Sequence, residues 1–157
     1  MNSKTKKPSL HAVQKTILVV DDDPSVREMI GRVLAAEGYP VLSASTGAEA
    51  VEIAASNRID LVLLDLNMPG QGGWDTFEKL TSNDPLLAVI IVTARPGQLF
   101  TALGAGVGAL LEKPLDFPKL LETVRAVLAE SPQVRMARLA GQHADFHYLA
   151  SGGKTNQ

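Results

Sequence analysis

Two acidic clusters in this chain each follow a short apolar run. Three consecutive aspartates, 21–23, come directly after the run 17–20, and Asp65 comes directly after the run 61–64. Short, continuously apolar runs are typical of strands that are buried on both faces of a parallel sheet. Ligands bind at the carboxyl ends of such strands, so we expect both clusters to face one pocket. The chain is therefore predicted to be an α/β protein with an acidic site at one edge of its sheet.

Two further apolar runs also end in polar residues. The run 87–92 is followed by Thr93, and the run 109–111 is followed by Glu112 and Lys113. Crowded carboxylates raise one another's pKa unless a cation neutralises them. The four strand ends would thus bring acids, a hydroxyl group and an ammonium group to one region.

The segments between the apolar runs have the spacing of amphipathic helices. Pro24 suits the first position of a helix that ends near Gly38, and Asp116 suits the N-cap of the last helix. The helix after Thr93 is expected to be short, because proline and glycine surround it. Strands that alternate with helices indicate a doubly wound, five-stranded parallel sheet. The expected strands are 17–20, 41–44, 61–64, 87–92 and 109–111, with two of the helices at 48–57 and about 74–80.

Composition excludes several classes of protein. The 157 residues are 45% hydrophobic, which is enough for one domain with a core. The absence of cysteine excludes disulfides, thiolate metal sites and cysteine nucleophiles. No apolar stretch approaches the roughly 18 residues of a membrane-spanning helix, and the N-terminus lacks the apolar segment of a signal peptide. A cytoplasmic protein without membrane contact is expected.

Charge and periodicity divide the chain into three parts. Residues 1–16, with four lysines and no acid, are expected to be a flexible basic lead. Residues 17–130 form the predicted domain, whose acidic excess argues against direct binding of nucleic acid. Residues 131–157 are too short for a DNA-binding or enzymatic domain, and we expect a disordered tail or a short helix. Such a helix would dock on a partner or on a second copy of the chain, giving a homodimer.

The tail has a weak helical pattern of its own. Met136, Leu139, Phe146 and Leu149 follow a broken amphipathic spacing. His143 and His147 would share one face of such a helix, but two histidines without a third ligand are poor support for a metal site. Disorder is the default expectation for this segment.

Four segments of the chain resemble the receiver domain of two-component response regulators. They are ILVVDDDPSVREMI, LVLLDLNMPGQGG, IIVTA and LLEKP, in the family's order and at nearly its spacing, over residues 17 to about 130. The resemblance implies a flavodoxin-like fold with strand order 2-1-3-4-5. The switch point of this order lies between strands one and three, where Asp21, Asp22 and Asp65 would converge.

The resemblance also implies roles in phosphoryl transfer. Asp65 would accept a phosphoryl group from the phosphohistidine of a histidine kinase or a histidine phosphotransfer protein. Thr93 and Lys113 would contact phosphoryl oxygens, and the Lys113–Pro114 bond would be cis, as it often is in the family. Such a module promotes its own phosphorylation but is not an enzyme that turns over an external substrate. The downstream target is not indicated.

A divalent cation would be needed beside these carboxylates. The resemblance implies Mg²⁺ bound by Asp22, Asp65 and the main-chain carbonyl of Asn67, with Asp21 holding a metal-bound water. Asp23 would then point to solvent. These hard oxygen ligands are the ones that magnesium prefers.

One position departs from the family's pattern. The residue three before Lys113, usually tyrosine or phenylalanine, is Leu110, and the stretch between Thr93 and Lys113 is short and rich in glycine. Phosphorylation would shift the conformation of the face formed by strands four and five. This departure predicts that the conformational shift is smaller than usual in the family, or that it reaches a different face of the domain.

Two other interpretations remain open. A pseudo-receiver would use the fold for binding without phosphorylation, which the absence of the aromatic residue at Leu110 favours. A haloacid-dehalogenase-type phosphatase would use Asp21 as its nucleophile, because residues 21–25 partly fit the pattern Asp-x-Asp-x-Thr. That interpretation leaves the match around Asp65 without an explanation.

Overall fold

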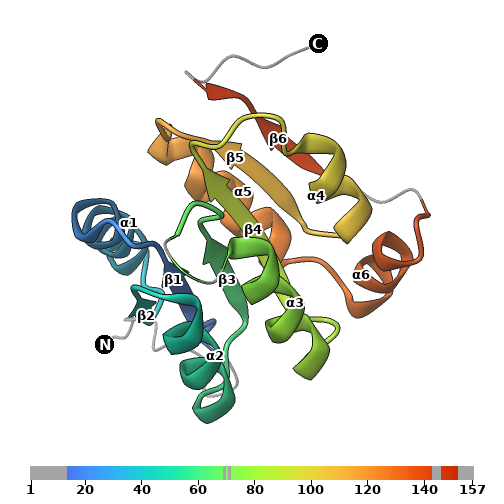
Figure 1. Ribbon diagram of the computed structural model, residues 1–157, viewed down its shortest axis with the longest axis horizontal. Coiled ribbons are helices and arrows are strands. Elements are labelled where there is room, and N and C mark those ends of the chain that lie inside the picture. Colours follow the sequence, from blue (N-terminus) through green and yellow to red (C-terminus); the bar gives the residue numbers. More distant parts are fainter. Residues whose placement is uncertain (1–13, 69, 71, 143–145, 152–157) are drawn as a thin grey trace, which may run out of the picture.

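One parallel sheet with helices on both faces forms the protein (Figure 1). The structure is a computed structural model that describes residues 14–68, 70, 72–142 and 146–151. The elements in chain order are β1 (Ile17–Val20), α1 (Pro24–Ala36), β2 (Val41–Ala44), α2 (Gly47–Ser56), β3 (Leu61–Leu64), α3 (Gly73–Asn83), β4 (Ala88–Thr93), α4 (Leu99–Ala105), β5 (Ala109–Glu112), α5 (Phe117–Leu128), α6 (Pro132–Leu139) and β6 (His147–Leu149).

The order of the strands is β2-β1-β3-β4-β5-β6, and each neighbouring pair is parallel. The flavodoxin-like order of the first five strands is confirmed. The expectation of a five-stranded sheet was wrong, because β6 from the tail adds to the outer edge of β5. A three-residue strand without an apolar run gives no periodic signal, and its pairing depends on an edge supplied by another part of the chain.

The predicted strands and helices lie close to the observed ones. β1, β2 and β3 have the predicted bounds, β5 extends one residue further, to Glu112, and β4 (Ala88–Thr93) begins and ends one residue later than predicted. The helix expected near 74–80 runs on to Asn83. Its last turn has no apolar residue, and the hydroxyl groups of Thr81 and Ser82 donate to the carbonyls of Phe77 and Glu78. An apolar pattern cannot predict a last turn of this kind.

Local signals fix where the long helices begin. The Asp23 carboxylate accepts from the Ser25 amide (2.9 Å) and caps α1, with Pro24 at the first helical position. The Asp116 carboxylate accepts from the Lys119 amide (3.1 Å) and caps α5. Both starts agree with the sequence prediction.

Two apolar layers hold the sheet between its helices. In β1, Leu18 and Val20 face a layer formed with α2, α3 and α4, whereas Ile17 and Val19 face a layer formed with α1 and α5. All four side chains are at most 1% exposed. Burial on both faces explains why the central strands are continuously apolar, and it leaves their carboxyl ends as the place for polar groups.

The tail was expected to be either disordered or a short helix, and where the structure describes it a short helix, α6, is present. Arg135 in α6 donates from Nη2 to the Val127 carbonyl (3.1 Å), and Arg138 forms an ion pair with Glu130, which anchors α6 to the end of α5. The broken helix expected from Met136 to Leu149 does not form, because α6 ends at Leu139 and β6 begins at His147. His147 lies in β6 and not in a helix. His143 and the N-terminal residues 1–13 lie outside the described residues.

None of the helices in the described part of the chain has the length and hydropathy needed to cross a membrane. The longest, α1, has 13 residues. A membrane-spanning helix needs about 20 residues that are mostly apolar.

An acidic site at the carboxyl ends of the central strands

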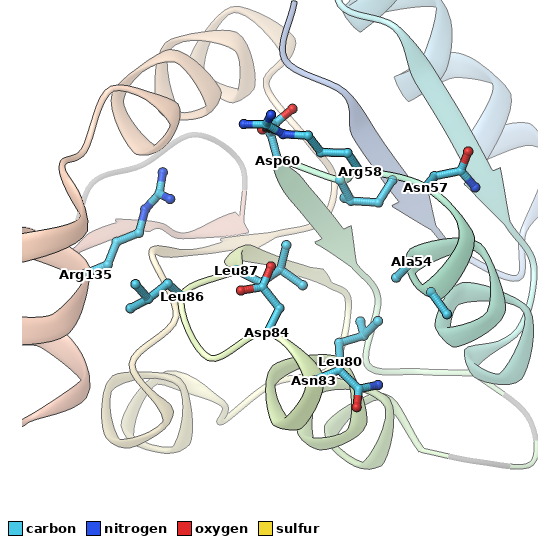
Figure 2. A pocket seen from close by; sticks show the side chains of 12 residues that line it. Ala54, Asn57, Arg58, Asp60, Leu80, Asn83, Asp84, Leu86, Leu87 and Arg135 are labelled. Atoms are coloured by element: carbon cyan, nitrogen blue, oxygen red, sulfur yellow. Dashed lines mark ion pairs between the residues drawn. The ribbon is translucent and has the colours of Figure 1, made fainter.

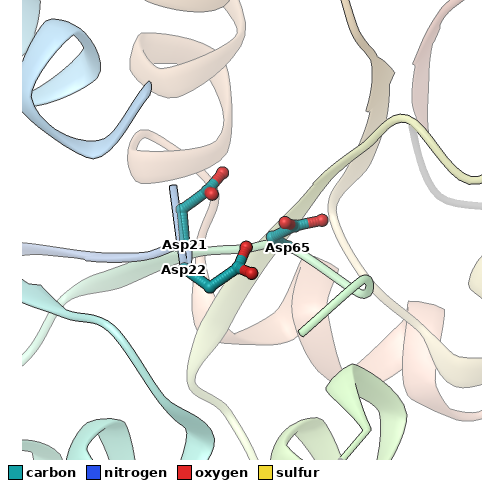
Figure 3. Close-up of side chains that lie close together, drawn as sticks. All are labelled: Asp21, Asp22 and Asp65. Atoms are coloured by element: carbon teal, nitrogen blue, oxygen red, sulfur yellow. The ribbon is translucent and has the colours of Figure 1, made fainter. Parts of the chain in front are cut away.

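Asp21, Asp22 and Asp65 converge where β1 and β3 end (Figure 3). Each offers one carboxylate oxygen, and these oxygens lie within 4.8 Å of one another. The sheet imposes this proximity, because Val20 is paired in register with Leu64 and the Asp65 amide donates to the Val20 carbonyl (2.9 Å). Residues 44 positions apart in sequence therefore share one site.

The three carboxylates differ in burial. Asp21 and Asp65 are 2% and 4% exposed, whereas Asp22 is exposed to solvent. Asp65 Oδ1 accepts from the Asn67 amide (3.0 Å), and Asp21 Oδ1 accepts from the Asp23 amide (2.9 Å). These bonds fix the side chains of Asp21 and Asp65, while Asp22 faces the water from which an ion would arrive.

Burial disfavours the ionised form of the Asp65 carboxyl group. Its pKa is raised above the ordinary value of 3.8, chiefly because burial removes water from the charged form and also because Asp21 repels it. The Asn67 amide and the charge of Lys113 oppose this rise only in part. Additional positive charge beside Asp65 would therefore favour its ionised, nucleophilic form.

Lys113 supplies an ammonium group from the end of β5. Its Nζ lies 2.8 Å from Asp21 Oδ2 and 3.5 Å from Asp65 Oδ2. Burial alone would lower the pKa of Lys113, but the hydrogen bond to Asp21 and the charges of Asp65 and Asp21 outweigh it and raise that pKa. The sequence analysis assigned Lys113 a contact with a phosphoryl oxygen on Asp65; its bond to Asp21 was missed.

Thr93 ends β4 beside Lys113. Its side chain is buried, and Oγ1 accepts from the Arg95 amide (3.0 Å). The Lys113 amide donates to the Thr93 carbonyl (2.9 Å), so the ends of β4 and β5 are joined. The Lys113–Pro114 peptide bond is cis, in agreement with the resemblance. Leu110 is fully buried.

Sequence reasoning missed three residues that shape the site. Arg27 donates from Nη1 to the Asp21 carbonyl (2.7 Å), and its position one turn into a helix that begins at the site was the available signal. Asp23 caps α1 in addition to facing solvent. A Cβ atom at Gly73 would overlap the main chain of Asp65 and Leu66, so only glycine lets α3 begin against this loop.

The donor set fits a hard divalent cation. Three carboxylates offer oxygen atoms at one place, and magnesium prefers oxygen ligands while keeping several waters. The raised pKa of Asp65 and its repulsion by Asp21 show that the cluster is short of positive charge. Asp22, which is exposed, is placed to bind an ion that retains water.

A hollow lies at the end of the sheet opposite the acidic cluster (Figure 2). It measures about 510 Å³ and is bordered by Arg58 and Asp60 before β3, by Asp84 after α3 and by Arg135 of α6. Because β3 separates Asp60 from Asp65, this hollow is distinct from the acidic cluster. Its cations and acids are mixed, and Arg58 pairs with Asp60 (3.6 Å).

Comparison with known proteins identifies similar domains. A family model described as the response regulator receiver domain matches residues 17–125. Response regulator MprA of Mycobacterium bovis (strain BCG / Pasteur 1173P2) is 40% identical over 133 residues, which is 83% of this chain and 58% of that protein. MprA of Mycobacterium sp. (strain KMS) is 40% identical over 114 residues, which is 71% of this chain and 50% of that protein. The chain thus spans about half the length of these curated relatives.

Solved structures show the same architecture. A CheY-like receiver domain protein from Methanospirillum hungatei JF-1 superposes with a TM-score of 0.71 at 30% identity, covering 74% of this chain and 94% of that one. The response regulator TrrA of Thermotoga maritima, solved in complex with Mg²⁺ and BeF, superposes with a TM-score of 0.68 at 32% identity, covering 73% and 99%. Both likenesses include sequence as well as fold.

Proposed function

Because this chain belongs to the response regulator receiver domain family, we propose that Asp65 accepts a phosphoryl group from the phosphohistidine of a histidine kinase or a histidine phosphotransfer protein. The observation that best supports this role is the buried Asp65 carboxylate between a lysine ammonium group and two further acids. Receiver domains are generally signalling modules. We propose that this one likewise turns over no external substrate.

The proposed reaction forms an acyl phosphate. A carboxylate oxygen of Asp65 attacks phosphorus, the bond between phosphorus and the imidazole nitrogen of the donor breaks, and that nitrogen keeps the electron pair. Lys113, which lies 3.5 Å from Asp65, would donate to one phosphoryl oxygen, and the Thr93 hydroxyl would donate to another. The Asp65 carboxylate needs no general base, because it carries no proton in its reactive form.

Asp22, Asp65 and the main-chain carbonyl of Asn67 would hold Mg²⁺, with Asp21 binding a water of the ion. When bound, the ion neutralises the negative charge shared by the carboxylates and the phosphoryl oxygens. Asp21 already accepts from Lys113 and from the Asp23 amide, which supports a role outside direct coordination. The fixed Asp65 side chain keeps its nucleophilic oxygen in one place.

The proposed output is a shift of the face formed by β4 and β5. Thr93 and Lys113 end these strands and are joined by a main-chain hydrogen bond, so groups drawn toward the phosphoryl would move both ends together. We propose that the protein acts in the cytoplasm and that its target is a protein and not nucleic acid. Dimerisation through the tail is part of the same proposal.

Mass spectrometry locates the phosphorylated residue. The full chain is incubated with acetyl phosphate and MgCl₂, digested, and mapped for the mass of one phosphoryl group. We expect the adduct on Asp65, its loss in Asp65→Asn, and full labelling in the control Asp75→Asn, which changes an exposed acid on α3. An adduct on Asp21 would support the phosphatase interpretation. No adduct, together with no uptake of beryllofluoride, would support the pseudo-receiver.

A further inference from the structure

Residues 146–151 cover the outer edge of β5, the edge that does not pair with β4. β6 runs parallel to β5, with Leu110 opposite Tyr148 and Leu111 opposite Leu149. The amide of His147 donates to the Gly108 carbonyl (3.3 Å). In Figure 1 this red strand lies beside β5 at the end of the sheet. Without it, β5 would present unpaired main-chain groups, which readily pair with another extended segment.

One side chain of β5 holds this segment at two points. Glu112 Oε2 accepts from the Tyr148 hydroxyl (3.0 Å), and Glu112 Oε1 accepts from the Ser151 amide (3.1 Å). Both carboxylate oxygens of Glu112 are therefore used to bind the tail. Hydrogen bonds to a charged acceptor are stronger than those between neutral groups, so Glu112 is the principal polar anchor of β6.

The remaining hold on β6 is incomplete. All three of its residues are only half-buried, whereas the residues of β1 and β3 are fully buried. Phe146 and Tyr148 pack against the apolar layer that includes Leu110, and Leu149 packs against the layer on the other face, but a hollow of about 560 Å³ lies between β6 and α5. Segments with few buried contacts open more readily than the core, so β6 is suited to leave its place while the rest of the fold stays intact.

The anchor of β6 is directly connected to the acidic site. Glu112 is the register partner of Thr93 and the neighbour of Lys113 in the chain. Lys113 in turn contacts both Asp21 and Asp65. A displacement of Lys113 or Thr93 toward a phosphoryl group on Asp65 would therefore act on a residue directly next to, or paired with, the one that binds Tyr148 and Ser151.

We propose that residues 146–151 form a releasable strand that covers the β5 edge, and that phosphorylation of Asp65 weakens its hold through Glu112. The coupling rests on the function proposed above, whereas the role of the Glu112 contacts does not. Release exposes the main-chain donors and acceptors of β5, which can then pair with an extended segment of a partner protein. The tail is thus an intramolecular competitor for this edge.

Amide hydrogen exchange, measured on the full chain without phosphorylation, tests the contact between Tyr148 and Glu112. Tyr148→Phe removes only the hydroxyl group that binds Glu112, and we expect exchange over 147–151 to become about fivefold faster. Tyr39→Phe, a change next to the opposite edge strand β2, is the matched control and leaves these amides unchanged. Glu112→Gln removes the charged acceptor and should reproduce the effect of Tyr148→Phe. Equal protection in all four proteins would overturn the inference.

Beryllofluoride with MgCl₂ then tests the coupling, with ¹⁹F NMR reporting whether this phosphoryl mimic is bound. We expect its binding to accelerate exchange over 146–151 about tenfold, and by reciprocity the loosened Tyr148→Phe to bind it more tightly than the unmodified chain. A bound ¹⁹F signal with unchanged exchange would overturn the coupling and leave the function of Asp65 intact. No bound signal would contradict the proposed function, and the coupling with it.

Discussion

The acidic site and the β6 edge use similar contacts in different surroundings. At the acidic site, Lys113 donates to Asp21 over 2.8 Å, and at the edge Tyr148 donates to Glu112 over 3.0 Å. Asp21 is almost fully buried, whereas β6 is half-buried throughout. Burial strengthens electrostatic interactions and makes unpaired charge costly, while exposure weakens both effects. We therefore expect changes at the centre to affect chemistry strongly and changes at the edge to affect mainly local opening.

The largest effect is expected for Lys113→Met. This change removes the ammonium group beside Asp65 but keeps a side chain of similar length. Loss of one preorganised donor to a charged group in a buried site typically slows chemistry by about 100-fold or more. The rate of acyl phosphate formation from acetyl phosphate measures the effect, with the exposed Lys79→Met on α3 as the control. A loss below about threefold would contradict the central role of Lys113.

Asp22→Asn should come next, because it removes the exposed carboxylate of the cluster. Even outer-shell groups of metal sites are typically worth about tenfold in affinity, so a direct ligand should contribute at least that much. Isothermal titration with MgCl₂ measures the change. Asp23→Asn is a matched control, because asparagine caps α1 as well as aspartate does while removing the neighbouring charge. Equal losses in both variants would show that Mg²⁺ responds only to the total charge.

Asp65→Asn should stabilise the protein at neutral pH without metal. The folded pKa of Asp65 lies above the ordinary value of 3.8, so the folded state binds this proton more tightly than the unfolded chain. Below pH 3.8 the carboxyl group is protonated in both the folded and the unfolded state, and the folded state keeps the full stability of its neutral, buried form. This stability is lost as the pH rises through the raised folded-state pKa, because the buried group then ionises. The melting temperature of Asp65→Asn should therefore exceed that of the unmodified chain by several degrees at neutral pH.

Thermal unfolding across the acidic range checks the sign of this effect. The advantage of Asp65→Asn should shrink as the pH falls toward 3.8, because the unmodified carboxyl group then becomes neutral as well. The Lys113–Asp21 pair remains in both proteins and cancels in the comparison. A constant difference, or a difference that grows in acid, would show that burial does not control the charge of Asp65.

The smallest global effect is expected at the edge. Glu112→Gln should lower the free energy of unfolding by only about 0.5–1 kcal/mol, because the contacts it weakens are partly exposed. Urea denaturation measures this difference. A loss above about 2 kcal/mol would indicate that β6 is part of the cooperative core. The contrast between a buried centre and a releasable edge would then be wrong.

The sequence predicted the buried centre more fully than the edge, and the reason is physical. β1 and β3 are buried on both faces, which requires continuous apolar runs, and the carboxylates that follow them stand out. Pro24 marks the start of α1 and Asp116 caps α5, and both are local signals that short-range patterns reveal. That the two acidic clusters share one pocket was expected from their positions at strand ends, and the strand order implied by the family resemblance placed Asp21, Asp22 and Asp65 at the switch point between strands one and three.

The contacts that the sequence did not predict depend on long-range placement. β6 has three residues and gains its strand conformation from the β5 edge, so no local pattern marks it. The bond from Lys113 to Asp21 depends on the reach of a flexible side chain across the sheet. The pairing of Tyr148 with Glu112 joins a tail that was expected to be disordered to the strand beside the site.

The most direct test of the phosphoacceptor role is a crystal structure of the full chain with MgCl₂ and beryllofluoride. We expect beryllium on a carboxylate oxygen of Asp65, the ion on Asp22, Asp65 and the Asn67 carbonyl, and Lys113 turned from Asp21 toward a fluorine atom. Beryllium on Asp21, or an ion bound away from Asp22 and Asp65, would contradict the assignment of Asp65 as the phosphoacceptor.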